Sequence, residues 1–179
     1  LSVVAVSLTL TVFFLPRDLL VPLARVGWLR RLLRFLLRPG VSYAVWVVVL
    51  VSWHVPRFYE AALHHRLWHD LMHASFVVGG LLVWTQIIDP SRHRRLNLSE
   101  RLGYTALVFW TGQIMAYVIL FDPTPLFSTY VDQPVRLLGL SPLTDQKLAG
   151  VVMMVEQVAT VGLAFVLLLR AGQRRRSET

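Results

Sequence analysis

Long apolar runs, separated by polar and basic stretches, are the dominant pattern along the chain. The runs are continuously apolar and lack the alternation of β-strands in a membrane barrel, so they predict helices. About 20 helical residues cross a hydrocarbon core of about 30 Å. We therefore expect an all-α, polytopic transmembrane helix bundle with five spans, forming a single domain over residues 1–179. The expected spans are residues 1–15, 41–55, 67–88, 102–121 and 145–169.

Two segments near the start of the chain, residues 1–15 and 26–37, need separate interpretation. The run at 1–15 is short for a span and Pro16 ends it, so we expect the chain to begin inside a longer polypeptide. Val26–Leu37 carries arginines and leucines at helical spacing. That spacing is typical of a helix lying in the headgroup plane, and a simple basic loop is the alternative.

Composition supports a membrane protein. Of the 179 residues 55% are hydrophobic, and the mean hydropathy is +0.57. These values are too high for an ordinary soluble domain. The chain has no cysteine, which excludes disulfides and thiolate metal sites. Any metal must therefore bind to His, Met or carboxylate side chains.

The positive charges are concentrated in the segments that connect the spans, so they indicate membrane orientation. A net charge of +8 could indicate nucleic acid. Fourteen of the eighteen Lys and Arg residues, however, fall in the stretches 17–38 and 89–101 and in the tail 170–179. With five spans, all three of these segments lie on the same side of the membrane. The positive-inside rule makes them cytoplasmic, with the N-terminus outside and the C-terminus inside. We expect membrane lipid as a partner, and no nucleic acid.

Five of the six histidines lie between Ser52 and His73. His69 and His73 are four residues apart, so a helix would stack their rings on one face. His54 ends the preceding apolar run, and a short hairpin would bring all three imidazoles to one side of the membrane. Neutral imidazole binds copper, zinc and iron. The alternatives are hydrogen bonds to loops or headgroups for the pair, and an aromatic belt around His54.

Further candidate ligands lie in the last span, in the same leaflet as the histidines. Met153 offers a thioether, which together with imidazole suits Cu(I), although methionine also fills gaps in cores. Asp145 is either an acid at a helix start or a carboxylate that orients a metal-bound histidine. Glu156 lies about three turns into the span, where a carboxylate must be protonated, hydrogen-bonded or paired. The tail after this span is expected to be disordered.

Catalytic motifs are not evident. His-Asp-Leu-Met-His at 69–73 has the histidine spacing of a zinc protease helix but lacks the glutamate after the first histidine. No glycine loop for phosphate and no Ser, His and Asp set for acyl transfer is found. We therefore expect a protein that is not an enzyme.

Four segments form a recognisable combination: WHVP at Trp53–Pro56, the YEAAL that follows, the histidine pair, and LSPLTDQKLAGVVMM at Leu140–Met154. Together they resemble the CtaG-type family of caa3 cytochrome c oxidase assembly factors. The resemblance implies a multi-pass protein of the bacterial plasma (inner) membrane that is needed for active haem-copper oxidase. The chain departs from the family pattern at Met72, where an acid is usual, and at Met154, where a tryptophan is usual. The positions that match the pattern are His54, His69, His73, Asp145, Gln146 and Met153.

The resemblance also implies copper as the cargo. We interpret the chain as a metallochaperone that holds copper on His54, His69 and His73, with Met153 as a further ligand and Asp145 supporting a histidine. Its partners would be an oxidase subunit and other copper chaperones. Two other classes remain open. One is a haem b protein with His54 and a histidine of span three as axial ligands. The other is a structural subunit of a respiratory complex.

Overall fold

The computed structural model describes residues 26–89, 95–133 and 139–177, and within them every regular element is helical. The elements are α3 (Gly27–Leu36), α4 (Pro39–His54), α5 (Pro56–His64), α6 (Arg66–Ile88), α7 (Leu98–Phe121), α8 (Ser128–Val131), α9 (Pro142–Gln157), the π-helical turn η2 (Val158–Gly162) and α10 (Leu163–Ser177). The expected span at 1–15 lies outside the described residues.

Three of these helices are long and apolar enough to cross a membrane. They are α6, α7 and the continuous run Pro142–Arg174, and they correspond to the expected spans 67–88, 102–121 and 145–169. The expected span 41–55 corresponds to α4, which qualifies only together with α3, and these two helices are bent by 79°. The described residues thus hold three candidate spans, or four with the bent pair, where five were expected for the whole chain.

Prolines set the boundaries around the histidine-rich segment. Pro39 and Pro56 occupy the first turns of α4 and α5, where a missing N–H costs nothing. Val55 stands between the two helices with extended dihedrals (φ −73°, ψ 125°) because a residue before proline is excluded from the helical region. α4 must therefore end at His54, and the chain turns there into α5.

Capping side chains fix the starts of α7 and α9. The Asn97 side chain accepts a hydrogen bond from the Glu100 amide at 2.9 Å, and the Glu100 carboxylate accepts one from the Asn97 amide at 2.7 Å. This reciprocal capping box satisfies two N–H groups of the first turn. The Ser141 hydroxyl accepts the Thr144 amide at 3.1 Å and caps α9.

Two segments differ from expectation. Arg57–Arg66, expected from its polarity to be only a short connection between the spans 41–55 and 67–88, is largely helical, since α5 covers Pro56–His64. The basic tail does not begin as a disordered segment, because α10 continues through it to Ser177. Ala, Gln and Arg are good helix formers, and extending an existing helix needs no new nucleus. Within Val26–Leu37 the residues Gly27–Leu36 are helical and do not form a simple loop, and the position of this helix in the headgroup plane stays a prediction.

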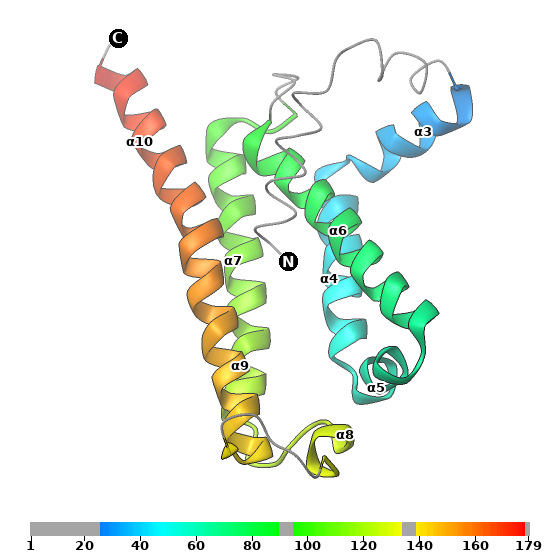
Figure 1. Ribbon diagram of the computed structural model, residues 1–179. Helices are drawn as coiled ribbons and strands as arrows, with labels where there is room; N and C mark the ends of the chain where they lie inside the picture. The colour runs from blue at the N-terminus through cyan, green and yellow to red at the C-terminus, as the bar shows by residue number, and fades with distance from the viewer. Residues whose placement is uncertain (1–25, 90–94, 134–138, 178–179) are drawn as a thin grey trace.

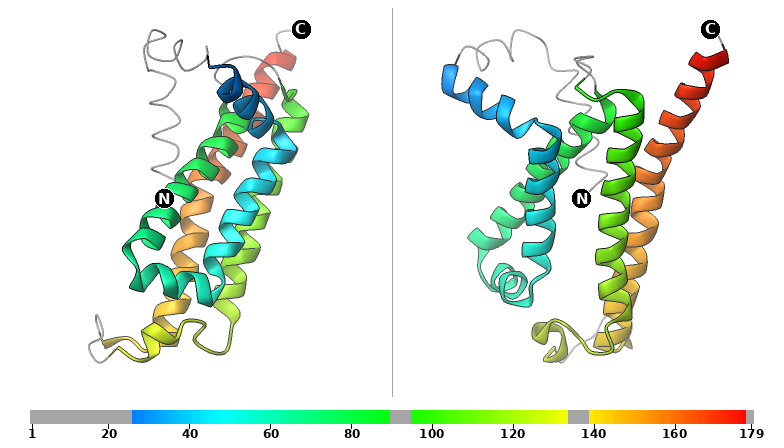
Figure 2. Two further views of the ribbon diagram at one scale, coloured as in Figure 1. Left: turned by 90° about the vertical axis from the view of Figure 1, so that its right-hand side faces the viewer. Right: turned by 180° about the vertical axis from the view of Figure 1, so that it is seen from behind.

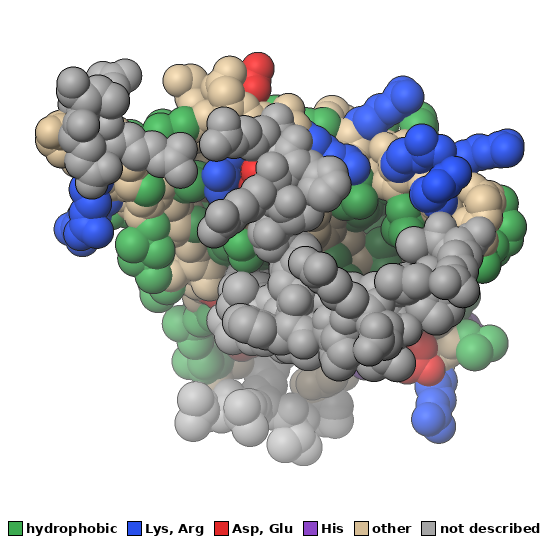
Figure 3. Space-filling view, turned by 90° about the horizontal axis from the view of Figure 1, so that it is seen from above, with side chains coloured by type: hydrophobic (Ala, Val, Ile, Leu, Met, Phe, Trp, Pro, Cys, Tyr) green, Lys and Arg blue, Asp and Glu red, His purple; other side chains and the backbone are tan. Residues whose placement is uncertain are grey.

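The helices form two antiparallel pairs. Figure 1 shows α4 beside α6 and α7 beside α9, with the pairs closest where the end of α6 lies near the start of α7 and diverging toward α5 and α8. The views in Figure 2 show the same pairing from the side and from behind. We call the end with α3, the start of α7 and the end of α10 the basic end, and the opposite one the α5–α8 end. Figure 3 shows Lys and Arg side chains gathered at the rim of the basic end where α3 lies.

The two pairs meet in a buried cluster near the basic end. Its members come from α6, α7 and η2, and partly buried aromatics of α4 pack against them. The cluster consists of Val83, Trp84, Ile87, Tyr104, Val108 and Val161. Hydrogen bonds support the contact, since Tyr43 and Thr111 join α4 to α7 through their hydroxyls at 2.7 Å. The junction near the basic end therefore holds the pairs together where they are closest.

Candidate functional site

His69 and His73 form a direct pair on α6. Their Nε2 atoms are 3.1 Å apart and their ring centroids 4.5 Å apart, and both side chains are exposed. Metal–nitrogen bonds of about 2 Å allow two ring nitrogens at this separation to share one ion. The i, i+4 spacing on a regular helix produces this arrangement without support from any other element.

His54 is held by the backbone of its own helix. Its Nδ1 lies 2.7 Å from the carbonyl oxygen of Leu50. A carbonyl only accepts, so Nδ1 carries the proton and Nε2 keeps its lone pair. This is the tautomer that a metal ligand needs, with the second nitrogen fixed by a hydrogen bond.

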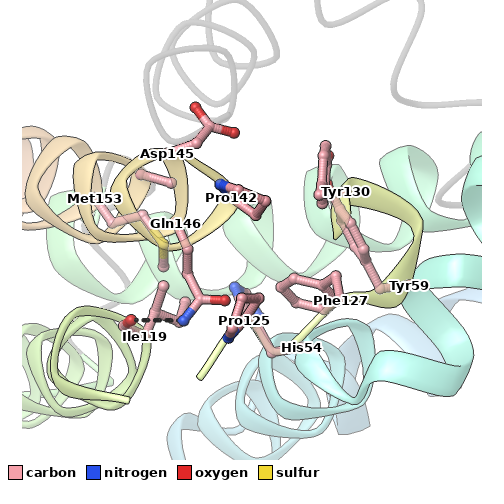
Figure 4. A pocket seen from close by; sticks show the side chains of 11 residues that line it. His54, Tyr59, Ile119, Pro125, Phe127, Tyr130, Pro142, Asp145, Gln146 and Met153 are labelled. Carbon is pink, nitrogen blue, oxygen red and sulfur yellow. Dashed lines mark hydrogen bonds between the residues drawn. The ribbon is translucent and has the colours of Figure 1, made fainter. Parts of the chain in front are cut away.

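His54 lies at a pocket shared with the other helix pair. The pocket has a volume of about 190 Å³ and lies between α4, α9 and the loop after α7. We call it the outer pocket (Figure 4). The side chains that line it are His54, Tyr59, Ile119, Pro125, Phe127, Tyr130, Pro142, Asp145, Gln146, Ala149 and Met153. His54 and Met153 therefore share this pocket from different helix pairs.

Asp145 and Gln146 have different roles at the pocket rim. Ser141 is the cap of α9, and Asp145 is an exposed acid of its first turn, favoured there by the helix dipole. Its carboxylate extends away from His54 and Met153 in Figure 4. Gln146 is buried and donates to the carbonyls of Ile119 and Thr124 at 3.2 and 3.3 Å, while its oxygen accepts the Leu126 amide at 2.7 Å. It ties α9 to the end of α7.

The loop after α7 is fastened to α5 across the mouth of the pocket. The hydroxyls of Tyr59 and Tyr130 lie 2.8 Å apart, and the Tyr59 ring packs on Phe127 with centroids at 4.5 Å. Burial, and next the hydrogen bond to Tyr130, raise the pKa of Tyr59, so the phenol stays protonated. Glu60 accepts the Ser128 hydroxyl at 2.6 Å and the Ser128 amide at 2.7 Å. These donors lower the pKa of the Glu60 carboxyl.

The structure thus divides the candidate ligands into two sets. His69 and His73 lie beside each other on α6, whereas His54, Met153 and Asp145 line the outer pocket, with the Asp145 carboxylate extending away from the other two. Among residues 26–89, 95–133 and 139–177, no three His, Asp or Glu side chains form a group that could hold a metal ion. The three imidazoles therefore do not converge there. Sequence reasoning missed Tyr59 and Tyr130, whose contact joins residues 71 positions apart and leaves no local signal.

One family model matches the chain. The family of cytochrome c oxidase caa3 assembly factors (Caa3_CtaG) matches residues 1–174 of the 179. The chain belongs to this family. The match confirms the resemblance seen in the histidine-rich segment and the start of α9. No curated protein and no solved structure matches the chain.

Membership in the Caa3_CtaG family connects the geometry to a process. The family assembles cytochrome c oxidase, and the candidate spans of this member suit a protein that works within a membrane. Its candidate ligands are imidazole and thioether groups, gathered in the half of the molecule that contains α5 and α8.

Proposed function

We propose that this Caa3_CtaG member is a copper-handling assembly factor of the bacterial plasma membrane, which binds copper and passes it to an oxidase subunit. It acts as a carrier and not as a catalyst. The α5–α8 end faces the outside, and the basic end, with the arginines of α3 and of the end of α10, faces the cytoplasm and its anionic lipids. Other copper chaperones would supply the ion from outside.

The observation that carries this proposal is the 3.1 Å separation of the Nε2 atoms of His69 and His73. The pair is preformed and exposed, so an ion can reach it without a rearrangement of the helices. His54 and Met153 provide a second set of soft and borderline ligands at the outer pocket, suited to Cu(I). Two separate sets of ligands suit a carrier, because the copper ion must be released from the protein as well as bound by it.

Metal analysis of the purified full chain tests the proposal. A His69→Ala/His73→Ala variant should lose one copper per chain relative to the unaltered protein. The matched control is His64→Ala/His65→Ala, which removes two neighbouring exposed histidines and should keep the full copper content. Equal copper in the unaltered protein and in the 69/73 variant would end the proposal for the pair. Oxidase activity in cells carrying each variant then tests delivery.

A further inference from the structure

A second pocket adjoins the outer one, closer to the basic end. Its volume is about 430 Å³, and α4, α5, α6 and α9 contribute to it. We call it the inner pocket. It shares His54, Tyr59 and Met153 with the outer pocket. Its other lining residues are Trp46, Leu50, Trp53, Met72, Phe76, Val152, Glu156 and Gln157.

Two oxygen atoms in this pocket lack partners. Oε1 of Glu156 and Oε1 of Gln157 are buried, and neither has a hydrogen-bond donor among the described residues. Gln157 is only 9% exposed. Among residues 26–89, 95–133 and 139–177 the one ion pair joins Arg66 and Asp70 at the surface, so no described cationic side chain pairs with Glu156. A carboxylate inside a membrane span is costly unless it is protonated or paired, and such residues mark ion pathways.

The position of Glu156 makes it a partner for Met153. The two residues are three apart on α9, which places their side chains on one helix face, and both line the inner pocket. Met153, Glu156 and His54 thus line one space, to which they bring a thioether, a carboxylate and an imidazole. Carboxylate and Cu(I) together are neutral, so the pair can remain in apolar surroundings where either charge alone would be expensive.

The local backbone also departs from the regular helix at this point. Immediately after Gln157 the chain makes the π-helical turn η2. Such turns are rare and occur frequently at functional sites. The side-chain amide of Gln157 packs closely on Gly112 of α7, where a Cβ would lie 1.9 Å from the Gln157 Nε2.

We infer that the inner pocket is a second copper position, where Met153 and Glu156 bind Cu(I) with His54. This inference rests on the proposed copper function and deepens it. His54 and Met153, common to both pockets, form the passage between them. An ion received at the outer pocket can move one helical turn deeper without leaving these two ligands.

Competition between the full-length protein and a chromogenic Cu(I) chelator tests the inner position. Glu156→Gln keeps the shape but removes the charge, and it should weaken binding of one Cu(I) per chain by about tenfold or more. Met153→Leu should do the same. Met154→Leu is the matched control, because Met154 lines neither pocket and should leave binding unchanged.

X-ray absorption of the bound copper supplies a separate readout. A sulfur neighbour should be present in the unaltered protein and in Met154→Leu, and absent in Met153→Leu. Unchanged Cu(I) affinity in Glu156→Gln would overturn the inner position. If the Cu(I) affinity of Glu156→Gln is unchanged but the His69→Ala/His73→Ala variant binds less copper than the unaltered protein, the inner position is wrong and the proposed function stands. A protein that binds no copper at all would overturn both proposals.

Discussion

At the scale of single residues, Gly150 decides how closely α9 approaches α7. A Cβ at Gly150 would lie 3.2 Å from both the carbonyl oxygen of Ala116 and the amide nitrogen of Leu120. These are backbone atoms of a helix, which cannot give way without separating the pair. The close contact places Gln146 within reach of the Ile119 and Thr124 carbonyls and so sets one wall of the outer pocket.

Gly150→Ala is therefore expected to destabilise the protein relative to Gly103→Ala. Both changes add the same methyl group inside a helix and gain about 1 kcal/mol of helix propensity. Position 103 has no atom within 4 Å of the added group, whereas position 150 is overpacked. We expect a difference of about 1–3 kcal/mol between the variants, measured by unfolding in detergent. Equal stabilities would mean that α7 shifts freely.

The residue scale also shows which site features are readable from sequence. The contact between His69 and His73 was predicted because it depends only on helical spacing. His54 sharing a pocket with Met153 was expected from the topology, but the contributions of Tyr59, Phe127 and Tyr130 were not. These depend on how the loop after α7 folds back over α5, and no periodicity encodes that.

At the scale of elements, the hydrogen bonds from Ser128 to Glu60 join α8 to α5 beside the outer pocket, and their strength depends on pH. Ser128 donates twice to Glu60, which lowers the pKa of this carboxyl below its ordinary value of 4.5. The stabilisation of the folded protein by the ionised Glu60 carboxylate is therefore present above pH 4.5, and it is lost as the pH falls through the lowered pKa. Ser128→Ala removes the hydroxyl donor, so the Glu60 pKa should rise and the contact should loosen at a higher pH.

Hydrogen exchange at the amide of position 128, followed from neutral to acidic pH, measures this effect. Protection should disappear at a higher pH in Ser128→Ala than in the unaltered protein. Ser99→Ala, at the opposite end of the molecule, is the control and should leave the profile unchanged. Identical profiles in Ser128→Ala and the unaltered protein would show that the hydroxyl does not hold the loop.

The elements themselves were predictable to different degrees. Length and hydropathy located α4, α6, α7 and the α9–α10 run within a few residues, because a hydrocarbon core sets the length of a span. Helix α5 was missed, since nine residues of mixed polarity give no decisive period. The helical tail was missed because its composition resembles a disordered segment, while the preceding helix in fact extends through it.

At the scale of the whole molecule, the two ends should face different compartments. The chain has no cysteine, so single cysteines can report orientation without background. Leu63→Cys in α5 and Gln173→Cys in α10 both lie at exposed positions of opposite ends. A membrane-impermeant maleimide should label position 63 in intact cells and position 173 only after permeabilisation. Labelling of position 173 in intact cells would contradict the charge-based orientation.

The wide turn at Val158–Gly162 has a consequence for the longest helical run. One additional residue in a turn rotates everything beyond it by about 100° around the axis, the angle per residue of an α-helix. The segment before the turn can therefore direct Met153 and Glu156 toward the inner pocket, while the segment beyond it directs Ala164 and Leu168 toward the buried cluster near the basic end. Deleting a single residue there would restore a regular α-helix and rotate one of these two faces away from its neighbour and toward the lipid.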